Sequence, residues 1–574
     1  MADEAAAGAE PRPVPKAQDV AWLLTLGAFA ALLLVNLGHY ALWDDEANTA
    51  IFAANLWNFH DLLAWDGTNI IAFRDGLELT GIKNRVFPPF QYVWAAPWIG
   101  VFGRTAFVAR FPFVLAAFGG FVLWAHWLRK ARIDWHVQLL YVMAILGNVS
   151  LFLYSRQSRY YGLSWALSVA FVYLYVHRAE SRRLKVLLAL TGMVLMATNY
   201  LTYGATMICF GLDYLLFELW KKKDTWAERL LFFASQVGFV AALISVFNPL
   251  GRKVTPYVPV SWWGDKMKLF WWNLRDLNAC EFFWPPFIVF ALVAFFAGRL
   301  RDVWLFRAVL ALALYAFVAS VLSQQPVGWA VVADIRYMAA AIPLCIFIGV
   351  RTLSSVSLKG RAGLAAQVVA VVIGAFFFLT TYPHAWFAKL SSSPDPIDHR
   401  STFVEFLGEL KNPPRQAYRE TAEWLNAHAA PGATVAVHPD YGGYSLMFHA
   451  PQLVFMWQFN PDRRAEYPML PDPHFRFLTV PDYFVSFGPD VNWARGVIPQ
   501  ISAQTGVRYD PEVRLDVAGV DKSRPELFWR TFKTVPMIHN ETHYITITQK
   551  YIFKNIIMCV CILTNSSYIC IRHK

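Results

Sequence analysis

Residues 106–161 read AFVARFPFVLAAFGGFVLWAHWLRKARIDWHVQLLYVMAILGNVSLFLYSRQSRYY, and this stretch decides the fold class. Each of its two apolar runs, 106–128 and 136–154, is long enough as a helix to cross most or all of a hydrocarbon core of about 30 Å. The basic cluster Arg129-Lys130-Ala131-Arg132 separates the runs, and a polar turn follows the second one. Similar runs recur along the first two thirds of the chain, which predicts a polytopic α-helical membrane protein.

The composition of the chain agrees with this prediction. Of 574 residues, 56% are hydrophobic and only 16% are charged, with a mean hydropathy of +0.36, whereas soluble domains carry about 25% charged residues. These values exclude a disordered protein and an ordinary cytosolic enzyme. The net charge of +11 does not indicate nucleic-acid binding, because the basic residues form short clusters between apolar spans. The six cysteines form no Cys-x-x-Cys pair, so no disulfide framework or structural metal site is predicted.

Lys/Arg-dense loops set the predicted orientation. Segment 87–104 is apolar but interrupted by Pro88, Pro89 and Pro97. If it does not cross, all five basic loops fall on one face, which the positive-inside rule makes cytoplasmic. We therefore predict a re-entrant or interfacial element there. The remaining apolar runs predict about eleven crossings, at residues 20–42, 106–128, 136–154, 160–177, 184–200, 203–219, 229–247, 284–298, 303–322, 331–350 and 364–382.

This topology divides the chain into four parts. A cytoplasmic tail (1–19) precedes a transmembrane domain (20–383) whose long outer loop is 43–105. An extracytoplasmic region (384–530) has a helix-like stretch followed by short strand-like runs, which predict a small α/β domain. The last part, 531–574, has no Ala and no Gly but nine Ile. We interpret this tail as an anomalous extension outside the fold, the alternative being a genuine C-terminal appendage.

Four clusters of charged residues lie on the predicted outer face. Trp43-Asp44-Asp45-Glu46 follows the first span, and its acids could cap a helix over 47–57, act in catalysis, or do both. In the turn 154–161, Arg156 and Arg159 are three residues apart and would share one side of a helix. They could bind a phosphate headgroup or, with the tyrosines around them, anchor the chain at the interface. Two clusters give weaker signals. Asp334 and Arg336 could simply form an ion pair with each other, and Lys83 and Arg85 could simply be solvated surface residues.

Together these motifs resemble the GT-C membrane glycosyltransferases. The resemblance covers roughly residues 20–385 and rests on the order of an outer Asp-Glu pair, a Pro-Pro element, an arginine at the start of the second span (Arg110), a Ser-Arg-x-x-Arg turn and an Arg-Tyr before a late span. The branch that looks most similar is glycosyltransferase family 39, with its protein O-mannosyltransferases and aminoarabinose-transferase-like proteins. Two departures are Phe87, where a histidine is common, and Tyr160-Tyr161-Gly162, where an aspartate is often found.

The resemblance implies a sugar donor on a polyprenyl phosphate and an inverting transfer to an acceptor hydroxyl. By match to the motif, Asp45 would be the general base and Glu46 would orient it or the acceptor. Charge on the departing lipid phosphate would be stabilised by basic groups. The residues in this role would be Arg156, Arg159, Lys83 and Arg85, with supporting roles for Asp44, Arg110, Tyr160, Asp334 and Arg336.

The expected reaction needs no cofactor, because arginine and lysine can neutralise a phosphate; a divalent metal is possible but not indicated. The expected partners are the lipid-linked donor, an acceptor that is a lipid, glycan or protein, and membrane lipids, with no nucleic acid. The Ala/Pro/Arg-rich body indicates a bacterial inner membrane protein that acts in the cell envelope. The alternatives are a secondary transporter or flippase for a lipid or anionic solute, which tends to place its charges at mid-membrane, and a non-catalytic subunit or polymer ligase on the same scaffold.

Overall fold

The computed structural model describes residues 16–131, 133–221, 224–248, 262–280, 302–323, 335–355, 402–413, 415–487, 491–507, 560–564 and 567–571. The predicted crossings 284–298 and 364–382 lie outside these residues, as does the predicted site residue Asp334. Of the tail after residue 530, the structure describes one antiparallel hairpin, formed by β6 (Val560–Thr564) and β7 (Ser567–Ile571). The boundaries of the four predicted parts therefore stay predictions.

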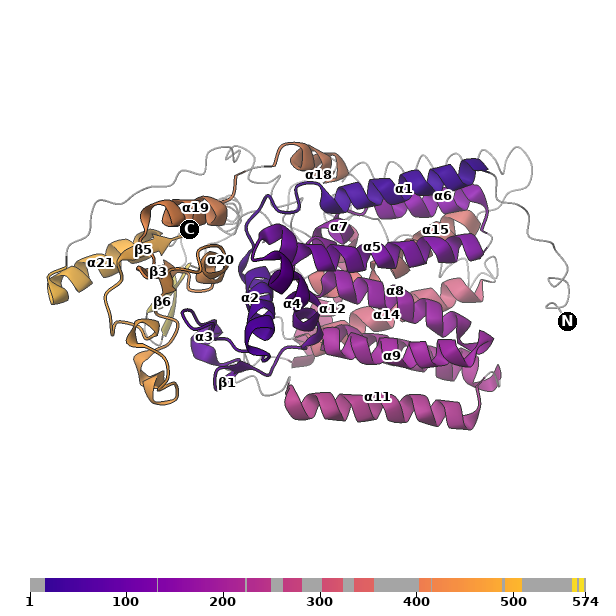
Figure 1. Ribbon diagram of the computed structural model, residues 1–574. Coiled ribbons are helices and arrows are strands. Elements are labelled where there is room, and N and C mark those ends of the chain that lie inside the picture. The colour runs from indigo at the N-terminus through magenta and orange to yellow at the C-terminus, as the bar shows by residue number, and fades with distance from the viewer. Residues whose placement is uncertain are drawn as a thin grey trace.

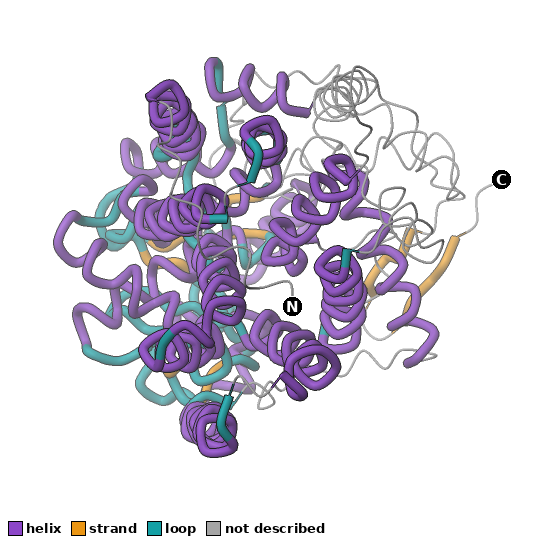
Figure 2. The backbone as a smooth tube through the Cα atoms, turned by 90° about the vertical axis from the view of Figure 1, so that its right-hand side faces the viewer, coloured by secondary structure: helices purple, strands orange, loops and turns teal. Residues whose placement is uncertain are grey.

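Long apolar helices run side by side and form a bundle (Figure 1), which Figure 2 views nearly along the helix axes. The prediction of a mostly helical membrane protein is confirmed. The bundle elements are α1 (Lys16–Leu34), α5 (Ala106–Lys130), α6 (Trp135–Leu146), α7 (Val149–Ser155), α8 (Tyr161–His177), the 3-10 turn η2 (Arg178–Glu180), α9 (Arg182–Thr198), α10 (Tyr200–Asp213), the π-helical turn η3 (Tyr214–Glu218), η4 (Leu219–Lys221), α11 (Trp226–Val246), α12 (Trp262–Cys280), α14 (Val303–Leu322), η5 (Ile335–Ala341) and α15 (Ile342–Ser355).

Length and apolarity single out the helices that can cross a membrane. Among the described residues, four helices pass this test: Ala106–Lys130, Tyr200–Lys221, Trp226–Val246 and Val303–Leu322. A fifth crossing results if α6 and α7, which bend by 56° at their break, count as one span. Most other predicted crossings in the described region coincide with helices of the bundle, but the count of eleven is not established. The chain is thus an integral membrane protein, with helix–helix contacts that depend on close packing.

The first helix ends earlier than the apolar run 20–42 predicts. Helix α1 stops at Leu34, and Asn36 takes the left-handed φ of 54° that suits a helix end. The carbonyls of Leu37, Tyr40 and Ala41 then turn toward the guanidinium of Arg110 and accept its hydrogen bonds. The residues after α1 are apolar because they pack against other parts of the protein. Hydropathy alone therefore predicts the end of this helix too late in the chain.

The basic helix ends lie at one end of the bundle, where ion pairs join them to neighbouring segments. Arg129 at the end of α5 pairs with Asp19 of α1, and Lys130 pairs with Glu180 after α8. Arg178 likewise bonds Glu218, at the end of the π-helical turn. These contacts place loops that are far apart in sequence on one face, as the alternation of the basic clusters predicts.

At the opposite end, α2 (Asp44–Phe59) and α4 (Phe90–Phe102) lie between the bundle and a small outer module (Figure 1). Helix α4 has 13 residues, about 20 Å of helix, which fits the prediction that 87–104 does not cross. The elements around it are α3 (Phe73–Gly76), β1 (Leu79–Thr80) and β2 (Lys83–Asn84). The outer module contains α19 (Ala417–His428), β3 (Thr434–His438), α20 (Gly442–His449), β4 (Val454–Phe455), η6 (Pro461–Ala465), η7 (Asp472–His474), β5 (Tyr483–Ser486) and α21 (Val491–Thr505). Helix α18 (Thr402–Lys411) packs instead on the bundle, where Phe406 stacks on Phe152 of α7.

The module is built on a parallel sheet of order β4-β3-β5. Its buried core is continuous with that of the outer loop, because residues such as Ala47 and Tyr92 belong to the same cluster as Tyr418 and Phe455. The outer loop and the C-terminal region therefore form one structural unit above the bundle.

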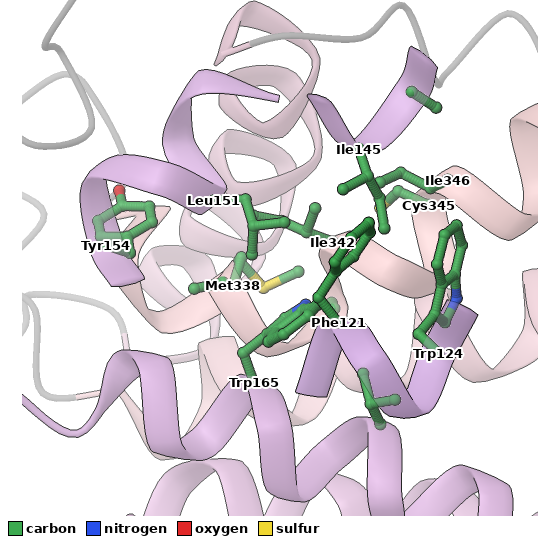
Figure 3. Close-up of a cluster of buried hydrophobic side chains, with 14 of the residues drawn as sticks. Phe121, Trp124, Ile145, Leu151, Tyr154, Trp165, Met338, Ile342, Cys345 and Ile346 are labelled. Carbon is green, nitrogen blue, oxygen red and sulfur yellow. The ribbon is translucent and has the colours of Figure 1, made fainter. Parts of the chain in front are cut away.

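The core of the bundle positions the turn that leads into α8. Figure 3 shows part of this core, where Phe121, Trp165 and Met338 come from α5, α8 and η5. Close approach of α5 and α8 requires a glycine at position 162, because a Cβ there would lie 2.7 Å from the carbonyl oxygen of Phe113. The turn before α8 is held against α5 in this way.

Candidate active site

The acidic cluster opens helix α2 instead of preceding it. Trp43 is the N-cap residue, so Asp44, Asp45 and Glu46 form the first turn. The alternative prediction, in which Asp44 or Asp45 caps a helix from residue 47, is wrong about the boundary. Three acids in a first turn are favoured by the positive end of the helix dipole. The Asp44 carboxylate accepts the Asp45 amide proton at 2.6 Å.

Asp45 lies between two guanidinium groups that belong to distant parts of the chain. Its Oδ1 is 3.1 Å from Nη2 of Arg159, and its Oδ2 is 3.2 Å from Nη1 of Arg336. The Asp45 side chain is 33% exposed, whereas Arg159 is 8% and Arg336 is 19% exposed. An acid with partial access to solvent thus meets two cations at the outer end of the bundle. We call Asp45, Arg159 and Arg336 the charged triad.

Arg159 is held by several contacts. Its Nη1 donates to Oγ1 of Thr49 at 3.2 Å, and its guanidinium lies 5.3 Å from the centre of the Tyr160 ring. Burial alone would lower the pKa of Arg159, but the carboxylate of Asp45 raises it above its usual value. Its Nε is buried and has no hydrogen-bond partner among the described residues. One donor of this guanidinium therefore remains for another acceptor.

Glu46 points away from the charged triad into the protein. It is fully buried and forms a fork with Arg110, with Oε1 2.8 Å from Nε and Oε2 2.6 Å from Nη2. Oε1 also accepts the backbone N–H of Ser158 at 2.7 Å. Such charge-assisted bonds are strong and geometrically specific. Glu46 and Arg110 therefore tie the start of α2 to the residue that precedes Arg159.

Arg156 does not face the same side as Arg159. The turn 154–161 was expected to continue as a helix there, but α7 ends at Ser155 and residues 156–160 leave the helical path. The Arg156 guanidinium instead donates to the carbonyls of Leu32, Leu33 and Val35 at the end of α1. Burial, together with the charge of Arg110, lowers its pKa to about 10, so it stays protonated at neutral pH.

Lys83 and Arg85 are both occupied by Asp61. Lys83 Nζ lies 2.7 Å and Arg85 Nη2 2.8 Å from its carboxylate oxygens. Partial burial would raise the pKa of Asp61, but the hydrogen bonds from Lys83 and Arg85 lower it to about 2. Asp61 was not among the predicted site residues. In this structure the two basic groups bind Asp61 and are not members of the charged triad.

Two site residues were not predicted. Thr49 lies four residues after Asp45, so it occupies the same face of α2, and that spacing could have indicated it. Trp43 packs its ring 5.6 Å from the guanidinium carbon of Arg336, and its buried Nε1 has no partner among the described residues. No sequence signal pointed to the contact between Trp43 and Arg336, because these residues lie nearly three hundred positions apart.

The described residues contain no group of three His, Cys, Asp or Glu side chains placed to hold a metal ion. The charged triad brings together one carboxylate and two guanidiniums, with aromatic groups beside them. A carboxylate can accept a proton, and guanidiniums can bind a phosphate and stabilise charge that develops on it.

The sequence matches no protein-family model and no curated protein sequence. The solved structures that are similar include ArnT from Cupriavidus metallidurans bound to undecaprenyl phosphate, at 14% identity and a TM-score of 0.49, and ArnT from the same organism in the apo state, at 13% and 0.48. Each comparison covers 76% of this chain and 86% of the other. At this level of similarity, the roles of individual residues depend on the site geometry alone.

Proposed function

We propose that this chain is a membrane glycosyltransferase that moves a sugar from a polyprenyl-phosphate donor to an acceptor hydroxyl on the extracytoplasmic side. One observation carries the proposal: Asp45, Arg159 and Arg336 meet at the end of the bundle opposite the basic helix ends. A lipid-linked donor cannot leave the membrane, so its reacting carbon has to be met where the hydrocarbon ends. Groups fixed on converging helix ends make the transfer effectively intramolecular.

In the proposed reaction, Asp45 takes the proton of the acceptor hydroxyl as the oxygen attacks the anomeric carbon. The bond between that carbon and the phosphate oxygen breaks, and its electron pair stays on the polyprenyl phosphate. Arg159 and Arg336 stabilise the added negative charge. A single displacement with one base inverts the anomeric configuration. Glu46 and Arg110 act as positioning residues, since both are buried and bonded to each other.

The test is transfer by the full-length protein in lipid nanodiscs, supplied with a panel of undecaprenyl-phosphate sugars and envelope acceptors. Asp45→Asn keeps the shape of the side chain but removes the base, and should reduce transfer at least about 100-fold. Arg415→Gln is a charge control, because Arg415 is exposed and pairs only weakly with Glu420. Unchanged transfer by Asp45→Asn would contradict the proposal.

The full-length protein in sealed lipid vesicles separates the transporter alternative. A flippase moves labelled donor lipid across a vesicle membrane without changing it, whereas a transferase releases undecaprenyl phosphate. Lipid movement without sugar release in the wild-type protein would favour the transporter.

A further inference from the structure

The hydroxyl group of Thr49 takes part in two hydrogen bonds of opposite sense. Its Oγ1 lies 3.1 Å from the backbone carbonyl oxygen of Asp45 and 3.2 Å from Nη1 of Arg159. A carbonyl oxygen can only accept a hydrogen bond, and a guanidinium can only donate one. The single hydroxyl proton of Thr49 therefore points to Asp45, and the oxygen accepts from Arg159.

The bond to Asp45 fixes the hydroxyl within its own helix. A helical threonine has two common rotamers, and a bond to the carbonyl four residues earlier selects between them. Thr49 is also fully buried, so water does not compete for its hydroxyl. The acceptor that Arg159 meets on α2 is thus held in one direction.

Arg159 contacts α2 at two points that are one helical turn apart. Its Nη2 lies 3.1 Å from Oδ1 of Asp45, and its Nη1 bonds Thr49. Contacts at two nitrogens restrict the rotation of a planar guanidinium, which a single contact leaves free to turn. The bond from the Ser158 amide to Glu46 places the backbone before Arg159, but it does not direct the side chain.

The two contacts of Arg159 respond differently to the proposed reaction. When Asp45 takes the proton of the acceptor, its carboxyl group becomes neutral and its hydrogen bond to Arg159 weakens. In the same step, the departing phosphate gains the charge that Arg159 has to stabilise. The hydroxyl of Thr49 takes no part in this proton transfer, so its bond to Nη1 keeps its strength.

We propose that Thr49 is a positioning residue, which keeps the Arg159 guanidinium directed at the leaving phosphate during sugar transfer. This inference rests on the proposed function and adds a residue to its machinery. Before transfer, the Asp45 anion still holds Arg159, so loss of the Thr49 hydroxyl affects donor binding little. Its effect falls on the transfer step, where the bond to Asp45 weakens.

The test is steady-state transfer by the full-length protein in lipid nanodiscs, with the rate expressed per folded molecule. Thr49→Val keeps the branched shape but removes the acceptor, and should lower kcat about tenfold while the KM for the donor changes by no more than about threefold. Thr49→Ala also lacks the hydroxyl and should show the same loss of kcat. Thr49→Ser keeps the hydroxyl, and its kcat should stay within about threefold of the wild-type value.

The order of the variants distinguishes positioning from packing. If Thr49 only fills space, valine should preserve kcat better than serine, because valine packs like threonine whereas serine leaves a cavity. That order, equal kcat in the valine and serine variants, or a change in KM alone would overturn the inference and leave the proposed function intact. Absence of transfer by the wild type with every donor would overturn both.

A double-mutant cycle examines whether Thr49 acts through Arg159. Arg159→Lys keeps the charge but replaces the planar fork by a single nitrogen, so Thr49→Val should lower kcat by less than about twofold in that background. A tenfold loss in both backgrounds would mean that Thr49 acts independently of Arg159, and would overturn the inference.

The chain offers a matched control in Thr198 of α9. Thr198 is as fully buried as Thr49, and its hydroxyl donates to the carbonyl of Val194, four residues earlier, at 2.7 Å. Thr198→Val should leave kcat and KM unchanged. A loss of kcat as large as that of Thr49→Val would mean that removal of any buried threonine hydroxyl impairs transfer, and would overturn the inference.

Discussion

Replacing Glu46 by alanine is expected to loosen the turn that carries Arg159, although Glu46 itself is fully buried. The Ser158 amide donates to Glu46 Oε1 at 2.7 Å, and a hydrogen bond to a charged group contributes about 1.5–3 kcal/mol. Its loss should raise the equilibrium for local opening of the turn about tenfold to a hundredfold. Arg110 would also lose its carboxylate, and a buried charge without its partner costs about 3–5 kcal/mol of stability.

Hydrogen–deuterium exchange read by mass spectrometry measures the opening directly. In Glu46→Ala, peptides that cover residues 154–161 should exchange about tenfold or more faster, while peptides from α11 should change little. Glu46→Gln is the matched variant, because its amide oxygen can still accept the Ser158 N–H although the charge is lost. It should destabilise the protein but protect the turn better than alanine does.

Two results would refute this reasoning. Wild-type exchange over residues 154–161 in Glu46→Ala would mean that the bond to Ser158 does not hold the turn. Equal exchange in the alanine and glutamine variants would mean that the charge of Glu46 matters and its acceptor oxygen does not. In either case the turn would be positioned by the packing of α5 against α8, with Gly162 at the contact.

Three further predictions concern other parts of the molecule. Burial, with the charges of Arg110 and Arg419, lowers the pKa of His449 to about 4 from 6.5. As the pH falls, the histidine of the unfolded state therefore binds its proton before that of the folded state. The free energy of unfolding should fall by about 3 kcal/mol as the pH drops from 6.5 to 4. In His449→Gln, the melting temperature should change less between pH 6.5 and 4 than it does in the wild type. The same pH dependence in both proteins would contradict the assignment to His449. Arg307→Met leaves the buried Asp213 without its cation, so the free energy of unfolding should fall by about 3–5 kcal/mol. The melting temperature should fall accordingly, while sugar transfer per folded molecule is retained. Finally, alkaline phosphatase fused after Thr225 should be inactive and a copy inserted at Pro431 active, and the reverse pattern would contradict the orientation.

The sequence predicted that Asp45 and Arg159 meet and placed Arg336 on the same face, but it did not predict the partners of Arg156, Lys83 and Arg85. Span counting and the positive-inside rule put both residues at the same end of the bundle, and the structure brings them to 3.1 Å. Arg156 was paired with Arg159 by assuming helical geometry, which fails because α7 ends one residue earlier. Lys83 and Arg85 were predicted without their nearby acid, Asp61, which binds both.

These successes and failures have one physical origin. Which end of a helix a residue occupies follows from the alternation of apolar and basic segments, because the membrane imposes it on every span. The direction of a side chain within that end depends on where each helix stops, and helices stop where other groups satisfy their last carbonyls. Arg110 and Arg156 do so for the segment after α1, over separations of about 70 to 125 residues.

The same carbonyl-binding arginines also leave Asp45 to the other two guanidiniums. Arg110 is neutralised by Glu46, and the charge of Arg156 is spread over three carbonyl oxygens, so neither needs Asp45 as a partner. Asp45 is left to share two guanidiniums, Arg159 and Arg336, with whatever anion enters. Under the proposed function, Arg159 and Arg336 would bind a lipid phosphate that reaches them along the plane of the bilayer. The arginines that are satisfied elsewhere would then hold the fold and leave donor binding to these two.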